Sequence, residues 1–324
     1  MKTAKIYQYQ LPMDSGVILR EQRLQQRDGL VIELSDGIHT VRGEVAPLPE
    51  FSQETLEQAR EDLISLTQSW LNNEELDLDS NCPSVAFGFS MALLELEKQL
   101  PQEGNYQAAP LCSGDPDDLV VKLNEMSGKK IAKIKVGLYE PIRDGMVVNM
   151  FLELISDLSL RLDANRGWTA KKAEQFANYV HPQFRSRIEF LEEPCITPEE
   201  SLAFSKATDI AIAWDETVRD DGFTVETQEG VTAIVIKPTL VGSVEKCISL
   251  IEQAHQLGMQ AVISSSIESS LALTQLARLA AWKTPETIPG LDTIDLFKMQ
   301  LDTSWPNCDL PVAQLADLEV IWEN

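Results

Sequence analysis

The chain has 324 residues, 44% of them hydrophobic, which is enough for one large domain and a smaller one, each with its own core. Its 51 acidic and 27 basic residues give a formal charge of −24, and the resulting field repels phosphate backbones and anionic lipids. Nucleic acids and membrane surfaces are therefore poor partners for this protein.

The N-terminal sequence and the cysteines indicate the compartment. No apolar run near the N-terminus is long enough for the core of a signal peptide, and no later run approaches the roughly 18 residues of a membrane span. The five cysteines are odd in number and have no CxxC spacing, so we expect them to be reduced and mostly buried. The protein is expected to stay in the cytoplasm.

The first part of the chain predicts a small antiparallel sheet. Residues 20–36 and 41–45 alternate around Asp28-Gly29 and Asp36-Gly37, dipeptides that favour tight turns. Two helices are expected after the sheet. The first has Ser52 as its N-cap, and the second covers 83–100.

From about residue 108 the pattern changes to short apolar runs that each end in a polar or charged residue and precede a helical stretch. Strands that alternate with helices in this way form parallel βαβ units. The last run is weaker than the others. The eight predicted strands are 109–112, 131–136, 158–163, 188–192, 210–215, 233–237, 261–264 and 291–296.

Eight parallel strands with continuously apolar cores favour a closed barrel over an open sheet. Because the last strand leaves no room for a full helix after it, we predict an α/β fold, a (β/α)7β modified TIM barrel over 105–300. An α+β N-terminal capping domain over 1–104 is completed by the C-terminal tail, 301–324. An open doubly wound sheet is the alternative, but no GxGxxG follows the first run.

Charged residues close several of the predicted strands. The carboxyl ends of barrel strands form one rim, where active sites are built, and the spacing of about one strand–helix unit brings these residues to that rim. A single carboxylate after a strand is more often a helix N-cap or a salt-bridge partner, whereas the joint pattern is much harder to explain in that way. The residues are Lys133, Lys135, Asp163, Glu192, Asp215 and Lys237.

Three of these residues predict a metal site. Asp163, Glu192 and Asp215 lie on adjacent strands and offer hard oxygen ligands for Mg²⁺, which keeps positions open for water or substrate. Mn²⁺ is the alternative ion.

The lysines predict proton chemistry beside this metal. Lys133 and Lys135 are two residues apart, so the strand period points both side chains toward the barrel mouth. Their mutual repulsion and the nearby cation disfavour protonation of one lysine, which prepares it as a general base. Lys237 lies four strands further round and therefore opposite, an arrangement that suits removal of a proton α to a carboxylate. A Lys-x-Lys on an exposed edge strand is the simpler alternative.

With these residues in place, the chain resembles the o-succinylbenzoate synthases of the enolase superfamily, and the γ-proteobacterial type in particular. The resemblance covers essentially the whole chain and depends on the order and spacing of its motifs. These are GEVAPLP with FSQET, APLC, KIKVGL, LDAN, FLEEP, WDE and IKPTLVGS.

The resemblance implies the syn dehydration of 2-succinyl-6-hydroxy-2,4-cyclohexadiene-1-carboxylate to 2-succinylbenzoate, a step toward menaquinone. Lys135 then removes the proton at C1 and helps hydroxide leave from the same face, while Lys237 lies as a cation over the π-face of the ring. Lys133 tunes Lys135, and the three carboxylates hold Mg²⁺.

The same resemblance suggests roles for other residues, on weaker grounds. Arg161 and Asn165 flank Asp163 at strand spacing and are candidates to orient ligands or substrate. Ser264 and Gly290 are expected near the succinyl chain, and residues 13–26 are expected to form a loop that closes over the site. The resemblance also implies a monomer that acts on a small-molecule carboxylate.

Two other functions are open at this point. A racemase or epimerase of the same superfamily, acting on N-acylamino acids or dipeptides, also suits lysines on opposite faces of a substrate. A non-catalytic metal-binding scaffold is the other candidate, but a scaffold has no need to retain desolvated lysines opposite a metal.

Overall fold

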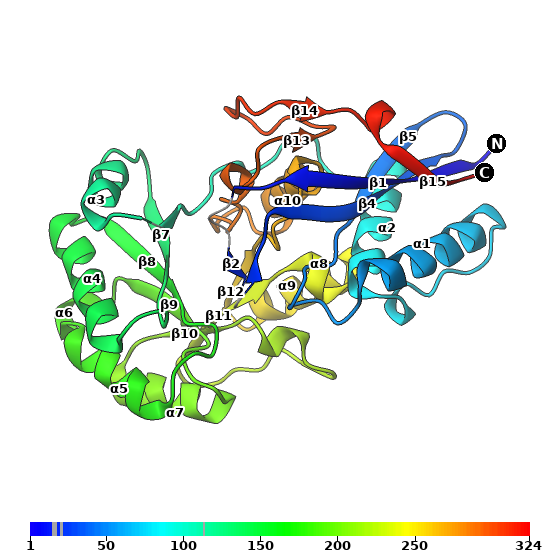
Figure 1. Cartoon of the computed structure of the whole chain (residues 1–324). Coiled ribbons are helices and arrows are strands. Elements are labelled where there is room, and N and C mark those ends of the chain that lie inside the picture. The colour runs from blue at the N-terminus through cyan, green and yellow to red at the C-terminus, as the bar shows by residue number, and fades with distance from the viewer. Residues whose placement is uncertain (15–17, 20–21, 113) are drawn as a thin grey trace. The chain divides into compact units, whose positions relative to one another are not determined.

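The computed structural model describes residues 1–14, 18–19, 22–112 and 114–324, and its ribbon is drawn in Figure 1. Contacts between Cα atoms divide the chain into two compact units. We call them the capping unit, which contains residues 1–107, 237–251 and 263–324, and the barrel unit, which contains residues 108–236 and 252–262.

The capping unit is built on an antiparallel sheet with the strand order β15-β1-β4-β5. β15 comes from the C-terminus and lies beside β1, so the two chain ends are neighbours in Figure 1. The C-terminal tail therefore completes this sheet. Its strands are β1 Thr3–Pro12, β4 Gln26–Ser35, β5 Thr40–Val45 and β15 Glu319–Glu323.

One of the two predicted turns in this sheet is confirmed and the other is wrong. Gly37 joins β4 to β5 with a φ of 92°, and the Asp36 carboxylate accepts hydrogen bonds from two backbone N–H groups of the turn, each at 2.7 Å. Asp28 and Gly29, in contrast, lie inside β4. A Cβ at position 29 would lie 2.3 Å from the hydroxyl oxygen of Tyr9, so glycine is needed there for close packing and not for a turn.

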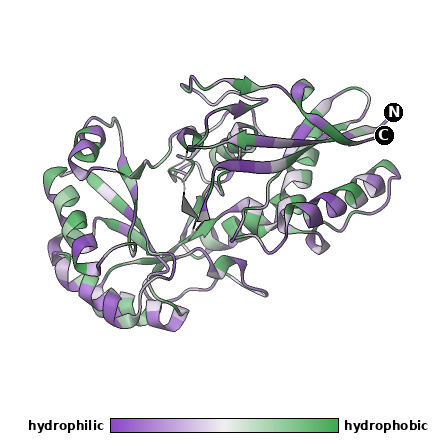
Figure 2. Cartoon of the chain, in the orientation of Figure 1, coloured by the Kyte–Doolittle hydropathy of each residue, from purple (hydrophilic) through white to green (hydrophobic). Residues whose placement is uncertain are grey.

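The two helices predicted after the sheet are present. α1 covers Leu56–Leu71 and α2 covers Pro83–Leu96. The N-cap of α1 is Thr55 and not Ser52, because Thr55 forms a capping box with Gln58, whereas the Ser52 hydroxyl accepts from the N–H of Leu48. Figure 2 shows hydrophilic and hydrophobic residues along α1, and its apolar residues join a core with the sheet and α2.

The capping unit also contains further helices and short strands. β2 pairs with β3 antiparallel, and β13 pairs with β14 parallel. These elements are β2 Ile18–Leu19, β3 Gln22–Arg23, η1 Leu78–Ser80, α8 Pro238–Val241, α10 Ser270–Lys283, η3 Ile294–Leu296, β13 Gln300–Leu301, β14 Val312–Ala313 and η4 Leu315–Asp317.

The barrel unit contains a sheet of seven parallel strands in the order β12-β11-β10-β9-β8-β7-β6, which is sequential along the chain. Sequential order is what repeated βαβ units produce, and the inner core of the sheet is apolar. The strands are β6 Leu111–Cys112, β7 Lys130–Lys135, β8 Leu158–Asp163, β9 Ile188–Glu192, β10 Ile212–Trp214, β11 Val231–Ile236 and β12 Gln260–Ile263.

Helices follow these strands along the chain, as the alternating pattern predicted. Most of them begin with proline at the first helical position, where the missing N–H costs nothing. They are α3 Pro116–Asn124, α4 Pro141–Leu154, α5 Ala170–Tyr179, α6 Pro182–Arg185, α7 Pro198–Thr208, η2 Thr217–Arg219 and α9 Val244–Gln256, the last of which is shared by both units.

The eighth predicted strand is wrong. Its segment, 291–296, contains the short helix η3, and a single parallel bridge between Ser264 and Gly290 is found just before it. Asp292 and Thr293 break the apolar run, which explains why this segment was the weakest of the eight. The parallel sheet thus has seven strands in the part of the chain that the structure describes.

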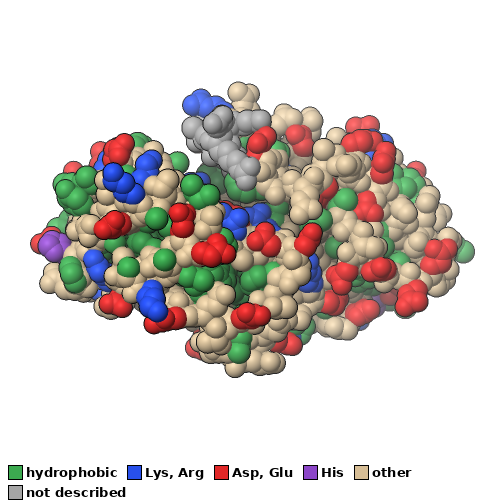
Figure 3. Space-filling view, turned by 90° about the horizontal axis from the view of Figure 1, so that it is seen from below, with side chains coloured by type: hydrophobic (Ala, Val, Ile, Leu, Met, Phe, Trp, Pro, Cys, Tyr) green, Lys and Arg blue, Asp and Glu red, His purple; other side chains and the backbone are tan. Residues whose placement is uncertain are grey.

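No helix of the described residues combines the length and the apolar character that crossing a membrane requires. Acidic side chains are spread over the face drawn in Figure 3, in keeping with the charge of the chain.

A buried carboxylate connects β5 to the start of α10 within the capping unit. Glu44 is 1% exposed and accepts hydrogen bonds from the Tyr9 hydroxyl at 2.6 Å and from the N–H groups of Ser269 and Ala272 at 2.9 and 3.1 Å. Burial raises the pKa of Glu44, although these hydrogen bonds oppose the shift. Glu44 therefore anchors the N-terminus of α10 to the sheet.

We expect Glu44→Ala to lower the free energy of unfolding by about 2–4 kcal/mol, because it leaves buried donors without an acceptor. Urea denaturation followed by circular dichroism measures this loss. Glu57→Ala is the matched control, since Glu57 is 69% exposed on α1 and its loss should change stability by less than about 0.5 kcal/mol. Equal stability of the two variants would contradict the assigned role of Glu44.

Candidate active site

The register of the parallel sheet aligns three of the predicted site residues. Lys135 pairs with Asp163 across β7 and β8, and Asp163 pairs with Glu192 across β8 and β9. Asp215 follows the last residue of β10, the next strand. The side chains of Asp163, Glu192 and Asp215 belong to residues only 7%, 2% and 1% exposed, so three buried carboxylates lie at the ends of adjacent strands, as predicted.

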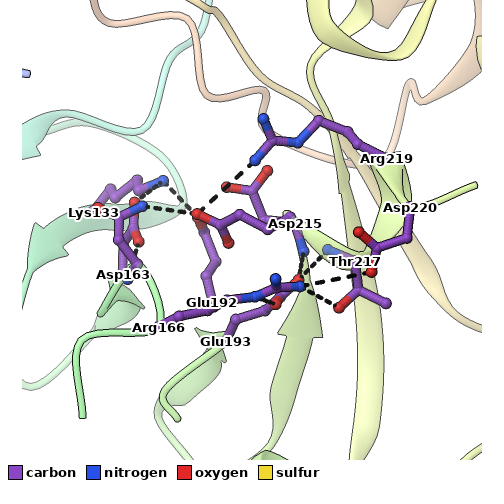
Figure 4. A network of polar contacts seen from close by, with 11 residues as sticks. Lys133, Asp163, Arg166, Glu192, Glu193, Asp215, Thr217, Arg219 and Asp220 are labelled. Atoms are coloured by element: carbon purple, nitrogen blue, oxygen red, sulfur yellow. Dashed lines mark hydrogen bonds and ion pairs between the residues drawn. The ribbon is translucent and has the colours of Figure 1, made fainter. Parts of the chain in front are cut away.

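Lys133 forms ion pairs with two of these carboxylates. Its Nζ lies 2.9 Å from Oδ2 of Asp163 and 2.7 Å from Oε2 of Glu192, and Figure 4 shows both contacts. Burial lowers the pKa of Lys133, but the charges of Asp163, Glu192 and Asp215 outweigh burial and raise the pKa above its usual value. The three carboxylates therefore favour the protonated form of Lys133.

The donor set fits a divalent cation. Three carboxylates offer hard oxygen ligands, and the Lys133 ammonium already lies between two of them, where positive charge is favoured. As the side chains stand, no three His, Cys, Asp or Glu residues among 1–14, 18–19, 22–112 and 114–324 are arranged to hold one ion. Binding would therefore require the carboxylates to converge and the Lys133 ammonium to give way.

Lys135 is the last residue of β7, and its side chain is exposed. Lys133 and Lys135 share one face of the strand, as the strand period predicted. The expected removal of Lys135 from water is not found, although its neighbours Ile134 and Val136 are buried.

Arg161 and Asn165 are both close to Asp163 but make different contacts. Arg161 is 3% exposed and its Nε donates to Oε2 of Glu189 at 2.9 Å. The backbone N–H of Asn165 donates to Oδ1 of Asp163 at 3.0 Å, and its side-chain amide donates to Glu216 at 3.3 Å. The backbone of Asn165 thus contacts Asp163, whereas Arg161 forms an ion pair with Glu189.

The remaining predicted residues belong to the capping unit. Lys237 follows β11 directly and is partly buried, and the hydroxyl of Ser264 donates to the carbonyl of Gly290 at 3.2 Å. The position of Lys237 opposite Lys135 stays a prediction. The predicted closing loop, residues 13–26, lies partly outside the described residues.

The sequence analysis assigned no function to Glu193, which follows the predicted metal ligand Glu192. The Glu193 carboxylate accepts from the backbone N–H groups of Asp215 at 2.8 Å and Thr217 at 2.6 Å, and it forms an ion pair with Arg166 (Figure 4). Glu193 was visible in the FLEEP motif. The sequence analysis assigned the neighbouring Glu192 as a metal ligand, and this assignment was enough to account for the motif. Nothing in the pattern therefore indicated a function for Glu193.

Comparison with known proteins supports one family for the whole chain. Residues 1–96 match the family "MenC, N-terminal domain", and residues 117–309 match the "Enolase C-terminal domain-like" family. The chain is 99% identical to an o-succinylbenzoate synthase from Aliivibrio fischeri, 63% identical to one from Proteus mirabilis and 58% identical to one from Vibrio cholerae. These matches cover 100% of this chain and 99–100% of each relative.

Solved structures share the fold at lower identity. An o-succinylbenzoate synthase from Thermosynechococcus elongatus, complexed with Mg in its active site, is 22% identical with a TM-score of 0.71 and covers 91% of this chain and 93% of its own. A dipeptide epimerase from Cytophaga hutchinsonii is 19% identical with a TM-score of 0.75 and covers 92% of this chain and 88% of its own. With its aligned strand-end carboxylates and full-length relatives, the chain belongs to the o-succinylbenzoate synthase family of the enolase superfamily.

Proposed function

We propose that this chain is a carbon–oxygen lyase that dehydrates 2-succinyl-6-hydroxy-2,4-cyclohexadiene-1-carboxylate to 2-succinylbenzoate in menaquinone biosynthesis. Relatives 58–99% identical over their full length carry the name of this synthase. The observation that carries the proposal is the register that aligns Lys135, Asp163 and Glu192 across three neighbouring strands. A proton-transferring lysine then lies beside charged oxygens that can hold a metal.

In the proposed mechanism Lys135 acts first as a base and then as an acid. Its neutral amine takes the proton from C1, and the electron pair of that C–H bond is delocalised onto the neighbouring carboxylate before it forms the double bond between C1 and C6. The bond between C6 and the hydroxyl breaks on the same face, and the Lys135 ammonium gives its proton to the departing oxygen, so that water leaves. The ring becomes aromatic and Lys135 returns to its neutral form.

Asp163, Glu192 and Asp215 are the residues proposed to hold Mg²⁺, with Mn²⁺ as the alternative. When bound, the ion stabilises negative charge that develops on the substrate carboxylate as the C1 proton is lost. Lys133, two residues before Lys135 on the same face of β7, is proposed to tune Lys135 through its positive charge. Lys237 is proposed to face the ring as a cation, and Arg161, Asn165, Ser264 and Gly290 to contact or orient ligands.

The alternative functions have less support. Dipeptide epimerases occur among the structural neighbours, but at 17–20% identity that likeness shows the fold alone. Relatives of much higher identity are synthases over their whole length. A metal-binding scaffold does not account for Lys135 beside the carboxylates. We also propose a cytoplasmic monomer with domain boundaries near residues 104 and 300.

We expect Lys135→Ala to reduce dehydration to background while the circular dichroism spectrum and melting temperature stay close to those of the wild type. Lys135 is an exposed strand-end residue, so its removal leaves no buried cavity. Lys130→Ala is the matched control, because Lys130 begins the same strand, is paired with Asp157 at 3.2 Å, and should not affect the reaction. Substantial turnover by Lys135→Ala would remove its role as the base.

Removal of divalent ions with EDTA should stop turnover, and added Mg²⁺ should restore it, because the three carboxylates then lose and regain their shared ion. The rate of 2-succinylbenzoate formation measures both steps. If the protein keeps its full rate after dialysis against EDTA, the assignment of the three carboxylates as ligands of a required metal is wrong.

The purified protein should act on the cyclohexadiene carboxylate far faster than on N-acylamino acids or dipeptides. A spectrophotometric assay of ring aromatisation, run beside polarimetry of the amino-acid derivatives, compares kcat/KM for the two reactions. Faster racemisation or epimerisation than dehydration would favour the alternative enzyme class.

A further inference from the structure

A fourth buried carboxylate at the site has no part in the mechanism above. Glu193 is 1% exposed and lies directly after Glu192. Figure 4 shows Glu192 near Lys133, whereas Glu193 lies beside Arg166 and Thr217. Burying a carboxylate is costly unless it is paired and hydrogen-bonded, so these contacts require an explanation.

The backbone at Glu193 leaves the regular path of the sheet. Its φ is 28°, an uncommon value for a residue with a side chain. The Glu193 N–H still donates to the carbonyl of Ala213 at 3.2 Å, which continues the pairing with β10, but its own carbonyl accepts from the N–H of Arg166 at 2.9 Å. The N–H of Asp215 therefore bonds to the Glu193 carboxylate in place of a backbone carbonyl.

Arg166 holds the Glu193 carboxylate that accepts the hydrogen bond from the Asp215 N–H. Its Nε forms an ion pair with Oε2 of Glu193, and another guanidinium nitrogen donates to the Thr217 hydroxyl at 2.8 Å. Arg166 follows β8, Glu193 follows β9 and Thr217 follows β10. Through one ion pair and one hydrogen bond, Arg166 thus connects the three loops that begin just after the proposed metal ligands.

We propose that Glu193, held by Arg166, is a positioning residue that fixes the backbone of Asp215 and so places its carboxylate for metal binding. The inference rests on the proposed role of Asp215 as a metal ligand. β10 has only three residues, and Asp215 lies beyond its end, so the strand itself provides little support. Groups that orient metal ligands in this indirect way commonly change metal affinity about 10–100-fold when they are removed.

Titration of the metal-stripped full-length chain with Mn²⁺, followed by the electron paramagnetic resonance signal of free Mn²⁺, tests this role. We expect Glu193→Ala to weaken Mn²⁺ binding about 10–100-fold. Glu193→Gln keeps an oxygen that accepts from both N–H groups, so it should retain most of the affinity. With Mg²⁺ as cofactor, the turnover that Glu193→Ala loses at low Mg²⁺ should largely return at saturating Mg²⁺.

Two further variants keep the test decisive. Arg166→Gln removes the ion pair from a side chain that is 29% exposed, so it should fold and still weaken Mn²⁺ binding. Glu44→Gln alters an equally buried glutamate in the other unit, and it should lower the melting temperature without changing Mn²⁺ affinity.

The outcomes separate the two proposals. If Glu193→Ala and Arg166→Gln bind Mn²⁺ as tightly as the wild type, the positioning role is wrong even though the metal site stands. If the wild type itself does not bind Mn²⁺, the carboxylate assignment fails, and the role of Glu193 fails with it.

Discussion

The burial of three carboxylates at the ends of neighbouring parallel strands is the constraint on which the site depends. Two unit charges 4 Å apart interact by about 4 kcal/mol at an effective dielectric constant of about 20, so such a cluster needs positive charge nearby. Lys133 supplies part of it through contacts of 2.9 and 2.7 Å. The same constraint explains why a divalent ion suits the site and why the charges of the carboxylates raise the pKa of Lys133.

The loops that follow two of these carboxylates, Asp163 and Glu192, contain uncommon backbone conformations. Asn165, Arg166 and Glu193 have positive φ values of 43°, 55° and 28°, and such conformations cost of order 1–3 kcal/mol each. They persist because the surrounding contacts fix them, in particular the Arg166–Glu193 ion pair and the backbone bonds to Glu193. Strain of this kind beside Asp163 and Glu192 fits a site that must hold its ligands in place.

Each of the two compact units contains a buried glutamate that accepts hydrogen bonds from backbone N–H groups. Glu44 in the capping unit and Glu193 in the barrel unit are each 1% exposed, and each accepts hydrogen bonds from two backbone N–H groups of a segment distant in sequence. A buried carboxylate with several donors is more directional than an apolar contact, because its oxygens must meet those donors. The anchoring of α10 in one unit and the proposed placement of Asp215 in the other thus depend on similar chemistry.

The sequence by itself determined the alternation of strands and helices, the three strand-end carboxylates and the pair Lys133 and Lys135. These features are local, because a period of two along a strand and a repeat of one strand–helix unit can be read without knowing any distant contact. Only the tertiary structure decided that Gly29 packs under Tyr9, that 291–296 forms no strand, and that Glu193 bonds to Asp215. Each of these depends on which distant residue comes close, and that is fixed by packing, not by the spacing of residues along the chain.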